Sequence, residues 1–377
     1  MRVVDVVGTC SDLVKLAPVI RKMQGHPQIV SILVQTGPHD DRGGSEQFLM
    51  DPEIKPLDFG LGVGPGSHAV QTAEVMRRLE PILDSIRPDL VLVVGDVNST
   101  PAAAITAVRL GISVAHVEAG LRSCDRTMPE EINRLLADAV ADLFFVTEEG
   151  GRENLLREGV AAEKIHFVGN LVVDALQAFR SRWEAASIFG RLQLDADHPY
   201  AVVTFDRPAG VDAPLDVMNL LDALHEVGRH LPVVVPLHPR VKQQLLRQGY
   251  MVRTVADSGQ PVPPKGIAFL DPLGYLDVIA LMSRARLVLT DSGGIQDETT
   301  VLGVPCLTLR NTTERRVTVT HGTNRVIGSD PARIMDEVLR TLDQPPQRKS
   351  PPPLWDGRAA ERIVRILADR QGRQHAA

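Results

Sequence analysis

The chain has 377 residues, 44% of them hydrophobic, and its 41 basic and 47 acidic side chains leave a formal net charge of −6 at pH 7. This length is typical of two domains with full cores, and the mild, evenly spread acidity argues against a nucleic-acid partner. No apolar run approaches the roughly 20 residues that cross a bilayer, and the first residues lack the features of a signal peptide, so we expect a cytoplasmic protein without a membrane partner.

Short apolar runs alternate with helical patterns along the whole chain. In the first part the strand-like runs are 2–8, 29–36, 89–96, 112–118 and 143–147, with a helix predicted over 12–23. In the second part they are 200–206, 231–238, 267–271, 286–293 and 305–310, with a helix over 215–229. Because these runs lack polar alternation, they predict parallel strands covered by helices on both faces. The predicted fold class is therefore α/β, with two Rossmann-like doubly wound domains facing a central cleft.

The repeated pattern also predicts the domain limits. We expect an N-terminal domain over residues 1–172 that carries acidic groups and a C-terminal domain over 173–355 that binds a ligand. The Pro-rich stretch 344–353 cannot be helical. The last segment, 356–377, begins with a helix that we expect to pack back on the N-terminal domain.

The turn after the first predicted strand reads GTCSDLVK. Thr9 and Asp12 are spaced as a capping box for the helix that carries Lys15, whose N-terminus could face an anion. A helix dipole would lower the thiol pKa of Cys10 and permit a nucleophilic role. A small neutral filler is the favoured reading of Cys10, because no histidine stands nearby in the sequence to activate it. The three cysteines match neither a disulfide framework nor a zinc site, so no metal is predicted.

Acidic residues follow three consecutive strand ends of the first domain. Asp96 follows the run LVLVV, Glu118 follows ISVAHV, and Glu130 stands beside Pro129 at the predicted start of a helix, four residues before Arg134. If the three carboxylates converge, their repulsion would keep one of them protonated near neutral pH, which would supply both an acid and a base. Helix caps and a surface Glu/Arg ion pair are the alternative reading.

Further candidates follow strands of the second domain. Asp206 and Arg207 come after YAVV, and His238 comes after LPVVV, where a structural hydrogen-bonding role is the alternative to a ligand contact. Arg315 suits a diphosphate, because its guanidinium matches phosphate oxygens. The glycines of LGVGPGS follow no convincing strand, so they are not a dinucleotide fingerprint and no cofactor is predicted.

The strongest local motif is DSGGIQDE, directly after the apolar run RLVLT. Gly293 and Gly294 let a phosphate approach the backbone, where Ser292 and the amides of the following helix can donate to it. Glu298 lies four residues after Gly294 and can accept from both hydroxyls of a ribose. The motif therefore favours a nucleoside diphosphate, with a tight turn and a solvated acid as the alternative.

Taken in order, these motifs resemble the non-hydrolysing UDP-N-acetylglucosamine 2-epimerase family over about residues 1–328. The segments that carry the resemblance are GTCSDLVKLAPVI, TGPH, LGVGPGSHAVQTA, GDVNST, AHVEAGLRS, DRTMPEEINR, VGNLVVDAL, DRPAGVD, TDSGGIQDE and NTTER. The resemblance implies two domains of the type B glycosyltransferase kind, a cytoplasmic homodimer, and interconversion of UDP-GlcNAc and UDP-ManNAc. UDP would be eliminated to leave 2-acetamidoglucal and then added back with inversion at carbon 2.

The resemblance also implies roles for matching residues. Asp96, Glu118 and Glu130 match the family's catalytic carboxylates, and Lys15 and Arg134 match polar residues of the active site. Ser292, Gly293 and Gly294 match its phosphate cradle, Glu298 its ribose ligand, Arg315 a further active-site arginine and His238 a substrate-binding histidine.

Two departures from the family pattern affect these expectations. Cys10 stands where the family usually has an arginine in GTRPE, and Asp206 stands where it usually has a histidine in HRP. Loss of two cations beside a dianionic leaving group predicts a weakened reaction, in which Asp206 either acts as a base or fills a gap. Pro38 and the DDRGG run after it predict altered activation by substrate. Arg316 is our candidate for restoring part of the missing charge.

Three alternatives to the epimerase remain open at this point. They are a UDP-sugar glycosyltransferase, a hydrolysing variant that releases UDP, and a nucleotide-sugar binder without turnover.

Overall fold

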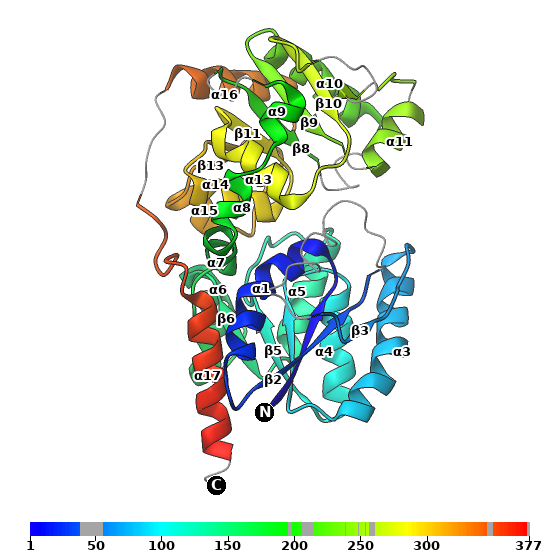
Figure 1. Ribbon diagram of the computed structural model, residues 1–377, viewed down its shortest axis with the longest axis vertical. Helices are drawn as coiled ribbons and strands as arrows, with labels where there is room; N and C mark the ends of the chain where they lie inside the picture. Colours follow the sequence, from blue (N-terminus) through cyan, green and yellow to red (C-terminus); the bar gives the residue numbers. More distant parts are fainter. Residues whose placement is uncertain are drawn as a thin grey trace. The chain divides into compact units, whose positions relative to one another are not determined.

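The structure, a computed structural model, describes residues 1–37, 56–194, 198–205, 214–237, 239–247, 249–252, 254–255, 261–344 and 350–374. Two compact units make up the chain (Figure 1). Unit 1 comprises Met1–Ala178 and Pro353–Ala377, and unit 2 comprises Phe179–Pro352.

Unit 1 is built on a seven-stranded parallel sheet in the order β3-β2-β1-β4-β5-β6-β7. Valine and leucine dominate the central strands, and β4 is buried along its whole length, as expected for a sheet covered on both faces. The order reverses between β1 and β4, so their carboxyl ends form a topological switch point. The strands are β1 (Arg2–Val7), β2 (Val30–Gln35), β3 (Phe59–Gly60), β4 (Leu90–Val94), β5 (Ser113–Val117), β6 (Leu143–Val146) and β7 (Ile165–Phe167).

Helices lie on both sides of this sheet (Figure 1). On one side, Leu79 and Leu83 of α3 and Ala103 of α4 share a buried core with Val4 and Val93 of the sheet. On the other side, α1 packs against α7 and α17. The helices of unit 1 are α1 (Cys10–Gln24), α3 (His68–Ile86), α4 (Ser99–Arg109), α5 (Pro129–Val140), α6 (Glu149–Arg157), the 3-10 helix η1 (Ala162–Lys164), α7 (Leu171–Ala178) and α17 (Ala359–Gln374).

The N-terminal end of the last helix, α17, is hydrogen-bonded to the rest of unit 1. The buried carboxylate of Asp174 accepts from the backbone N–H groups of Ala359, at 3.2 Å, and Ala360, at 2.9 Å. The indole N–H of Trp355 donates to the carbonyl of Thr147 at 3.1 Å. Because these bonds join residues that are 185 to 208 positions apart, the end of the chain belongs to the unit that the beginning forms.

Replacing the cap of α17 tests this attachment. We expect Asp174→Ala to lower the free energy of unfolding by about 2 kcal/mol, because two buried N–H groups lose their acceptor. Hydrogen exchange followed by mass spectrometry should show faster exchange in α17. The matched control is Asp330→Ala, which removes the bond from Arg333 N–H at the start of α16 in unit 2 and should accelerate exchange there instead. Unchanged protection of α17 in Asp174→Ala would contradict the assignment.

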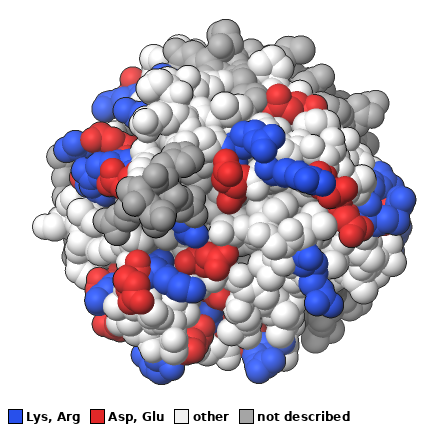
Figure 2. Space-filling view, turned by 90° about the horizontal axis from the view of Figure 1, so that it is seen from below, with Lys and Arg blue, Asp and Glu red and all other residues white. Residues whose placement is uncertain are grey.

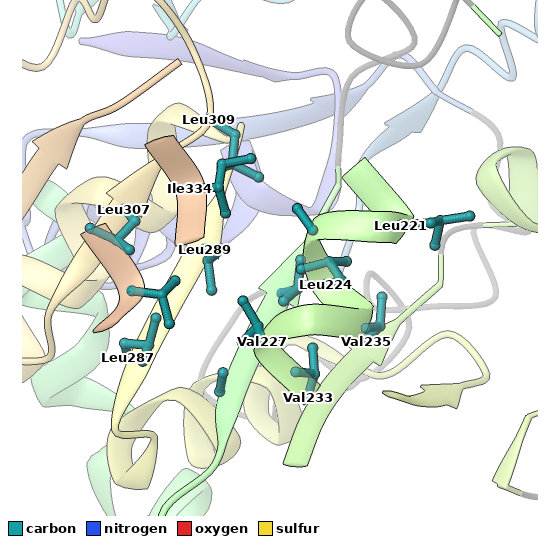
Figure 3. Packing of buried hydrophobic residues seen from close by; sticks show 14 of the residues in the cluster. Leu221, Leu224, Val227, Val233, Val235, Leu287, Leu289, Leu307, Leu309 and Ile334 are labelled. Atoms are coloured by element: carbon teal, nitrogen blue, oxygen red, sulfur yellow. The ribbon is translucent and has the colours of Figure 1, made fainter. Parts of the chain in front are cut away.

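Unit 2 has a six-stranded parallel sheet in the order β10-β9-β8-β11-β12-β13. In its core, Leu224 and Val227 of α10 face Val233 of β9, Leu289 of β11 and Ile334 of α16 (Figure 3). The strands are β8 (Ala201–Thr204), β9 (Pro232–Pro236), β10 (Gly266–Leu270), β11 (Leu287–Thr290), β12 (Cys306–Thr308) and β13 (Asn324–Val326). The helices are α8 (Arg180–Glu184), α9 (Ile188–Leu192), α10 (Pro214–Gly228), α11 (Pro239–Arg247), α13 (Tyr275–Arg284), α14 (Gly293–Leu302), α15 (Arg316–Thr320) and α16 (Pro331–Asp343).

The predicted α/β class with two parallel-sheet domains is confirmed. The units divide at Phe179, a few residues beyond the predicted limit at 173, because α7 packs against α1 within unit 1. Within the described residues, no helix is both long and apolar enough to cross a membrane. On the face drawn in Figure 2, acidic and basic side chains lie interspersed, in keeping with the near balance of charges in the sequence.

Candidate active site

Asp96 and Glu118 of unit 1 come just after two adjacent strands of the sheet. Strands β4 and β5 pair with Val94 opposite Val117, and Gly95 N–H donates to the carbonyl of Val117 at 3.1 Å. Both acidic residues therefore leave the sheet at the carboxyl edge, beside the switch point between β1 and β4.

Glu118 is held by Lys15 of α1. The Lys15 Nζ atom lies 2.9 Å from Oε1 and 3.1 Å from Oε2, and the glutamate is 3% exposed. Its backbone φ of +67° is in the left-handed region, which costs a non-glycine residue energy. Strain of this kind persists where surrounding contacts fix a side chain, and the ion pair with Lys15 is one such contact.

Asp12 lies beside this ion pair. It completes the predicted capping box with Thr9, and its Oδ2 accepts from the backbone N–H groups of Gly8 and Thr9 at 3.1 and 3.0 Å. Burial raises the pKa of Asp12 to about 6, although the charge of Lys15 and the hydrogen bonds of Thr9 and Gly8 oppose the shift. A Cβ on Gly95 would stand 3.6 Å from Asp12 Oδ1 and 3.8 Å from Glu118 Oε2, so both carboxyl groups border Gly95.

Asp96 forms an ion pair with Arg134 of α5. Arg134 is 1% exposed, and its Nε and Nη2 atoms donate to Glu131 Oε2 at 3.1 and 2.8 Å. Glu131 in turn accepts from Ser123 N–H at 2.9 Å and Cys124 N–H at 3.1 Å. The chain from the 123–124 backbone through Glu131 and Arg134 therefore fixes the carboxylate of Asp96.

Glu130 is the second residue of α5, directly after Pro129, and is half-buried. It stands at the amide-rich end of that helix, as the sequence predicts. Sequence spacing paired Glu130 with Arg134 but did not single out Glu131. Arg134 forms ion pairs with Glu131 and Asp96, which makes Glu131 a residue of the site that the sequence did not reveal.

Cys10 is the first residue of α1 and is half-buried. The first turn of α1 therefore presents a thiol at the position where the resemblance expects a guanidinium.

Within the described part of the chain, no group of histidine, cysteine and acidic side chains is arranged to hold a metal ion.

In unit 2, the motif after β11 forms the start of α14. Ser292 is the N-cap, Gly293 and Gly294 are the first helical residues, and Glu298 is buried at 8% exposure. A Cβ on Gly293 would lie 2.5 Å from Glu314 Oε1, so a side chain at this position would displace the Glu314 carboxylate. At Gly294 an added Cβ would meet no described atom within 4 Å, so the first turn is open there.

The loop that carries Arg315 is tied to α14. Gln296 Oε1 accepts from Thr313 Oγ1 at 2.6 Å and from Asn324 Nδ2 at 2.9 Å. Arg315 Nη1 lies 3.1 Å from Asp297 Oδ2, and the arginine is 4% exposed. The sequence did not point to Gln296 and Asp297, because their partners lie on other segments, in the loop after β12 and at the start of β13. The exposed Arg316 begins α15.

Three predicted site residues, Asp206, Arg207 and His238, lie outside the described residues, and so do Pro38 and the DDRGG run. Their roles stay predictions from the sequence.

Comparison with known proteins agrees with the resemblance seen in the sequence. A family model described as UDP-N-acetylglucosamine 2-epimerase matches residues 21–368. The UDP-N-acetylglucosamine 2-epimerase of Methanocaldococcus jannaschii is 35% identical over 373 residues, covering 97% of this chain and 99% of the relative. The UDP-2,3-diacetamido-2,3-dideoxy-D-glucuronate 2-epimerase of Pseudomonas aeruginosa is 34% identical over 372 residues, covering 98% and 99%.

Solved structures of such enzymes share the fold. The M. jannaschii UDP-GlcNAc 2-epimerase in complex with UDP-GlcNAc and UDP has a TM-score of 0.88 at 34% identity, covering 98% of this chain and 99% of that one. The Neisseria meningitidis UDP-GlcNAc 2-epimerase bound to UDP-GlcNAc has a TM-score of 0.84 at 29% identity, covering 98% and 100%. The family model and the relatives extend over nearly the whole chain, which therefore belongs to the UDP-N-acetylglucosamine 2-epimerase family, a family of isomerases.

Proposed function

We propose that this protein interconverts UDP-GlcNAc and UDP-ManNAc without net hydrolysis, by eliminating UDP to 2-acetamidoglucal and adding it back. The observation that carries the proposal is a pair of fixed carboxylates at one edge of the unit 1 sheet. Glu118 is held by an ion pair with Lys15, and Asp96 is held by an ion pair with Arg134. Family membership supports the substrate class, because relatives with this fold bind UDP-GlcNAc and UDP.

The chemistry requires residues of this kind. The hydrogen on carbon 2 of the sugar is not beside a carbonyl, so a base must remove it as the bond from carbon 1 to the diphosphate oxygen breaks. The electrons of the C–H bond then form the double bond of the glucal, and the diphosphate oxygen takes those of the C–O bond. Return of the proton to the opposite face of carbon 2 and of UDP to carbon 1 completes the inversion.

In this proposal the carboxylates of unit 1 move the proton. Asp96, Glu118 and Glu130 are the candidate bases and acids, and Lys15 and Arg134 keep two of them oriented. The half-buried Glu130 retains access to a ligand, whereas the geometry of Asp96 and Glu118 is set by their cations. Asp206 is a further candidate base on the sequence resemblance alone.

Unit 2 would hold the UDP part of the substrate. The backbone amides at the start of α14, with Ser292 and the glycines, suit phosphate oxygens, and Glu298 suits the ribose hydroxyls. Arg315 Nε is 3.8 Å from the Cβ position of Gly293, so its positive charge lies behind the same turn. Cys10, Arg207 and His238 complete the proposed substrate-binding set on the sequence resemblance.

A variant of Glu298 tests the nucleotide site. We expect Glu298→Gln to raise the dissociation constant of UDP by about tenfold to a hundredfold, since it weakens charge-assisted bonds to the ribose. Calorimetry with UDP and 2′-deoxy-UDP gives a sharper reading, because the variant should discriminate less between the two than the parent does. The control Glu337→Gln alters a glutamate of α16 that pairs with Arg325 of β13, and it should leave both affinities unchanged. Equal discrimination by parent and Glu298→Gln would contradict the ribose role.

Product analysis tests the reaction itself. Incubation with UDP-GlcNAc should yield UDP-ManNAc, detected by NMR, with little free UDP.

One observation favours a hydrolysing variant as second candidate. Cys10, in place of an arginine, would weaken recapture of UDP, and free UDP with released sugar or glucal would then accumulate. If neither product formed and the sugar were transferred to an added acceptor, the result would instead indicate a glycosyltransferase.

The family resemblance also supports a cytoplasmic homodimer as the working form. Sedimentation equilibrium of the full chain is expected to give twice the mass of 41.1 kDa, and a monomer at all concentrations would contradict it.

A further inference from the structure

A buried cluster in unit 1 lies behind the two carboxylates and is not used in the proposed reaction. His116, on β5, is 0% exposed, and its Nδ1 lies 2.7 Å from Asp138 Oδ1 while its Nε2 lies 2.9 Å from the carbonyl oxygen of Gly95. Gly95 immediately precedes Asp96. The ring of His116 therefore connects α5 to the backbone segment that carries Asp96.

Asp138 also fixes the backbone that carries Glu118. Its Oδ2 accepts from Gly120 N–H at 3.0 Å and lies 2.7 Å from Arg122 Nη1. His116 stands two residues before Glu118 and Gly120 two residues after it, so one carboxylate binds both sides of the strained glutamate. The left-handed φ of Glu118 is thus enforced by partners on each side of it.

The partners of His116 determine its protonation. A carbonyl oxygen accepts hydrogen bonds and cannot donate, so Nε2 must carry a hydrogen to bond Gly95. The Asp138 carboxylate is likewise an acceptor, so Nδ1 carries one too. Strands β4 and β6, on either side of β5, have no ionisable side chain, and the charges of Asp138 and Arg122 act on the ring. The geometry thus describes an imidazolium–carboxylate pair sealed from water.

The electrostatics agree with this geometry. Burial lowers the pKa of His116, but the charge of Asp138 and the hydrogen bonds of Asp138 and Gly95 outweigh it, so the pKa is raised. Burial acts in the opposite sense on Asp138, where the charges of His116 and Arg122 prevail and its pKa is lowered.

We propose that Asp138 and His116 are positioning residues, which hold the segments bearing Asp96 and Glu118 in register through a permanently charged, buried imidazolium. This inference rests on the proposed function for its effect on turnover, whereas the charge state of His116 does not. Both residues act through the backbone, so they should affect the rate of the chemical step more than substrate affinity.

Kinetics of the full-length protein test the positioning role. We expect Asp138→Asn to lower kcat by about a hundredfold with KM changed less than about threefold, because a small displacement of reacting groups costs rate of this order. The matched control is Asp142→Asn, whose carboxylate accepts from Val114 N–H at 3.1 Å, at the opposite end of β5. It should leave kcat within about twofold of the parent, as substitutions away from reacting groups usually do. Equal effects of the two variants on kcat would overturn the proposal.

Nitrogen-15 NMR of histidine-labelled parent protein gives an independent reading, with His116→Gln used to assign the signal. We expect both ring nitrogens of His116 to carry hydrogens at pH 8. A bare nitrogen at that pH would overturn the imidazolium, even if Asp138→Asn failed to fold. A parent protein without epimerase activity would overturn the proposed function alone, and the spectrum would still decide the charge state.

Discussion

Glu118→Gln is expected to lower kcat for UDP-GlcNAc epimerisation by about a thousandfold, within the range that general acid–base groups contribute. The amide cannot take up or return a proton, yet it has nearly the same shape as the carboxylate. It also removes the negative charge that pairs with the buried Lys15, so charge and orientation at the edge of the sheet are both altered. Steady-state rates measured by product NMR, with circular dichroism to verify folding, provide the test.

The control for this variant is Glu149→Gln. Glu149 is the first residue of α6, follows the neighbouring strand β6, and forms an exposed ion pair with Arg152. Exposed pairs of this kind contribute little, so the control should retain the parent rate. If Glu118→Gln kept more than about a tenth of the parent kcat, Glu118 would not be an acid–base group in this protein.

Cys10→Arg is expected to raise kcat by about tenfold or more. Cys10 begins α1, where the family pattern has an arginine, and one donor to a developing charge is typically worth about 3 kcal/mol. An arginine at this position would add positive charge at the start of a helix that already has N–H groups directed outward. The gain should be larger for the double variant with Asp206→His, which restores both family residues.

Ser11→Arg is the matched control, because it places the same charge one residue along on an exposed position. It should leave kcat within about twofold of the parent, as surface substitutions usually do. A rise in kcat with Cys10→Arg but not with Ser11→Arg would show that the thiol weakens the reaction. No rise would contradict the expectation and indicate a reorganised site in which another cation, such as Arg316, compensates.

Patterns that depend on neighbours in the sequence predicted much of this molecule. The unbroken apolar runs indicated parallel strands, and the predicted capping box of Thr9 and Asp12 is present at the start of α1, which begins at Cys10, two residues before the predicted helix. The positions of Asp96 and Glu118 after β4 and β5 followed from the rule that parallel strands end at one edge. The motif of Ser292 and the two glycines directly follows an apolar run, and it stands at the start of α14 as expected.

The partners of these residues could not be predicted, because they depend on packing between distant segments. Helical spacing put Glu130 in line with Arg134 but did not point to Glu131, which is anchored by the 123–124 backbone and bound to the guanidinium. His116 stands in the apolar run ISVAHV and was not predicted to have a buried partner. Nothing near His116 in the sequence points to Asp138, which is 22 residues away. Buried polar pairs of this kind leave no periodic signal.

Deuterium exchange at carbon 2 tests the central claim most directly. UDP-GlcNAc incubated with the protein in deuterated water is expected to acquire deuterium at carbon 2, seen as loss of the proton signal, as UDP-ManNAc appears. Elimination and re-addition require this exchange, whereas direct transfer or simple binding does not. A substrate pool that keeps its carbon 2 proton, while calorimetry shows that the protein binds UDP, would contradict the account.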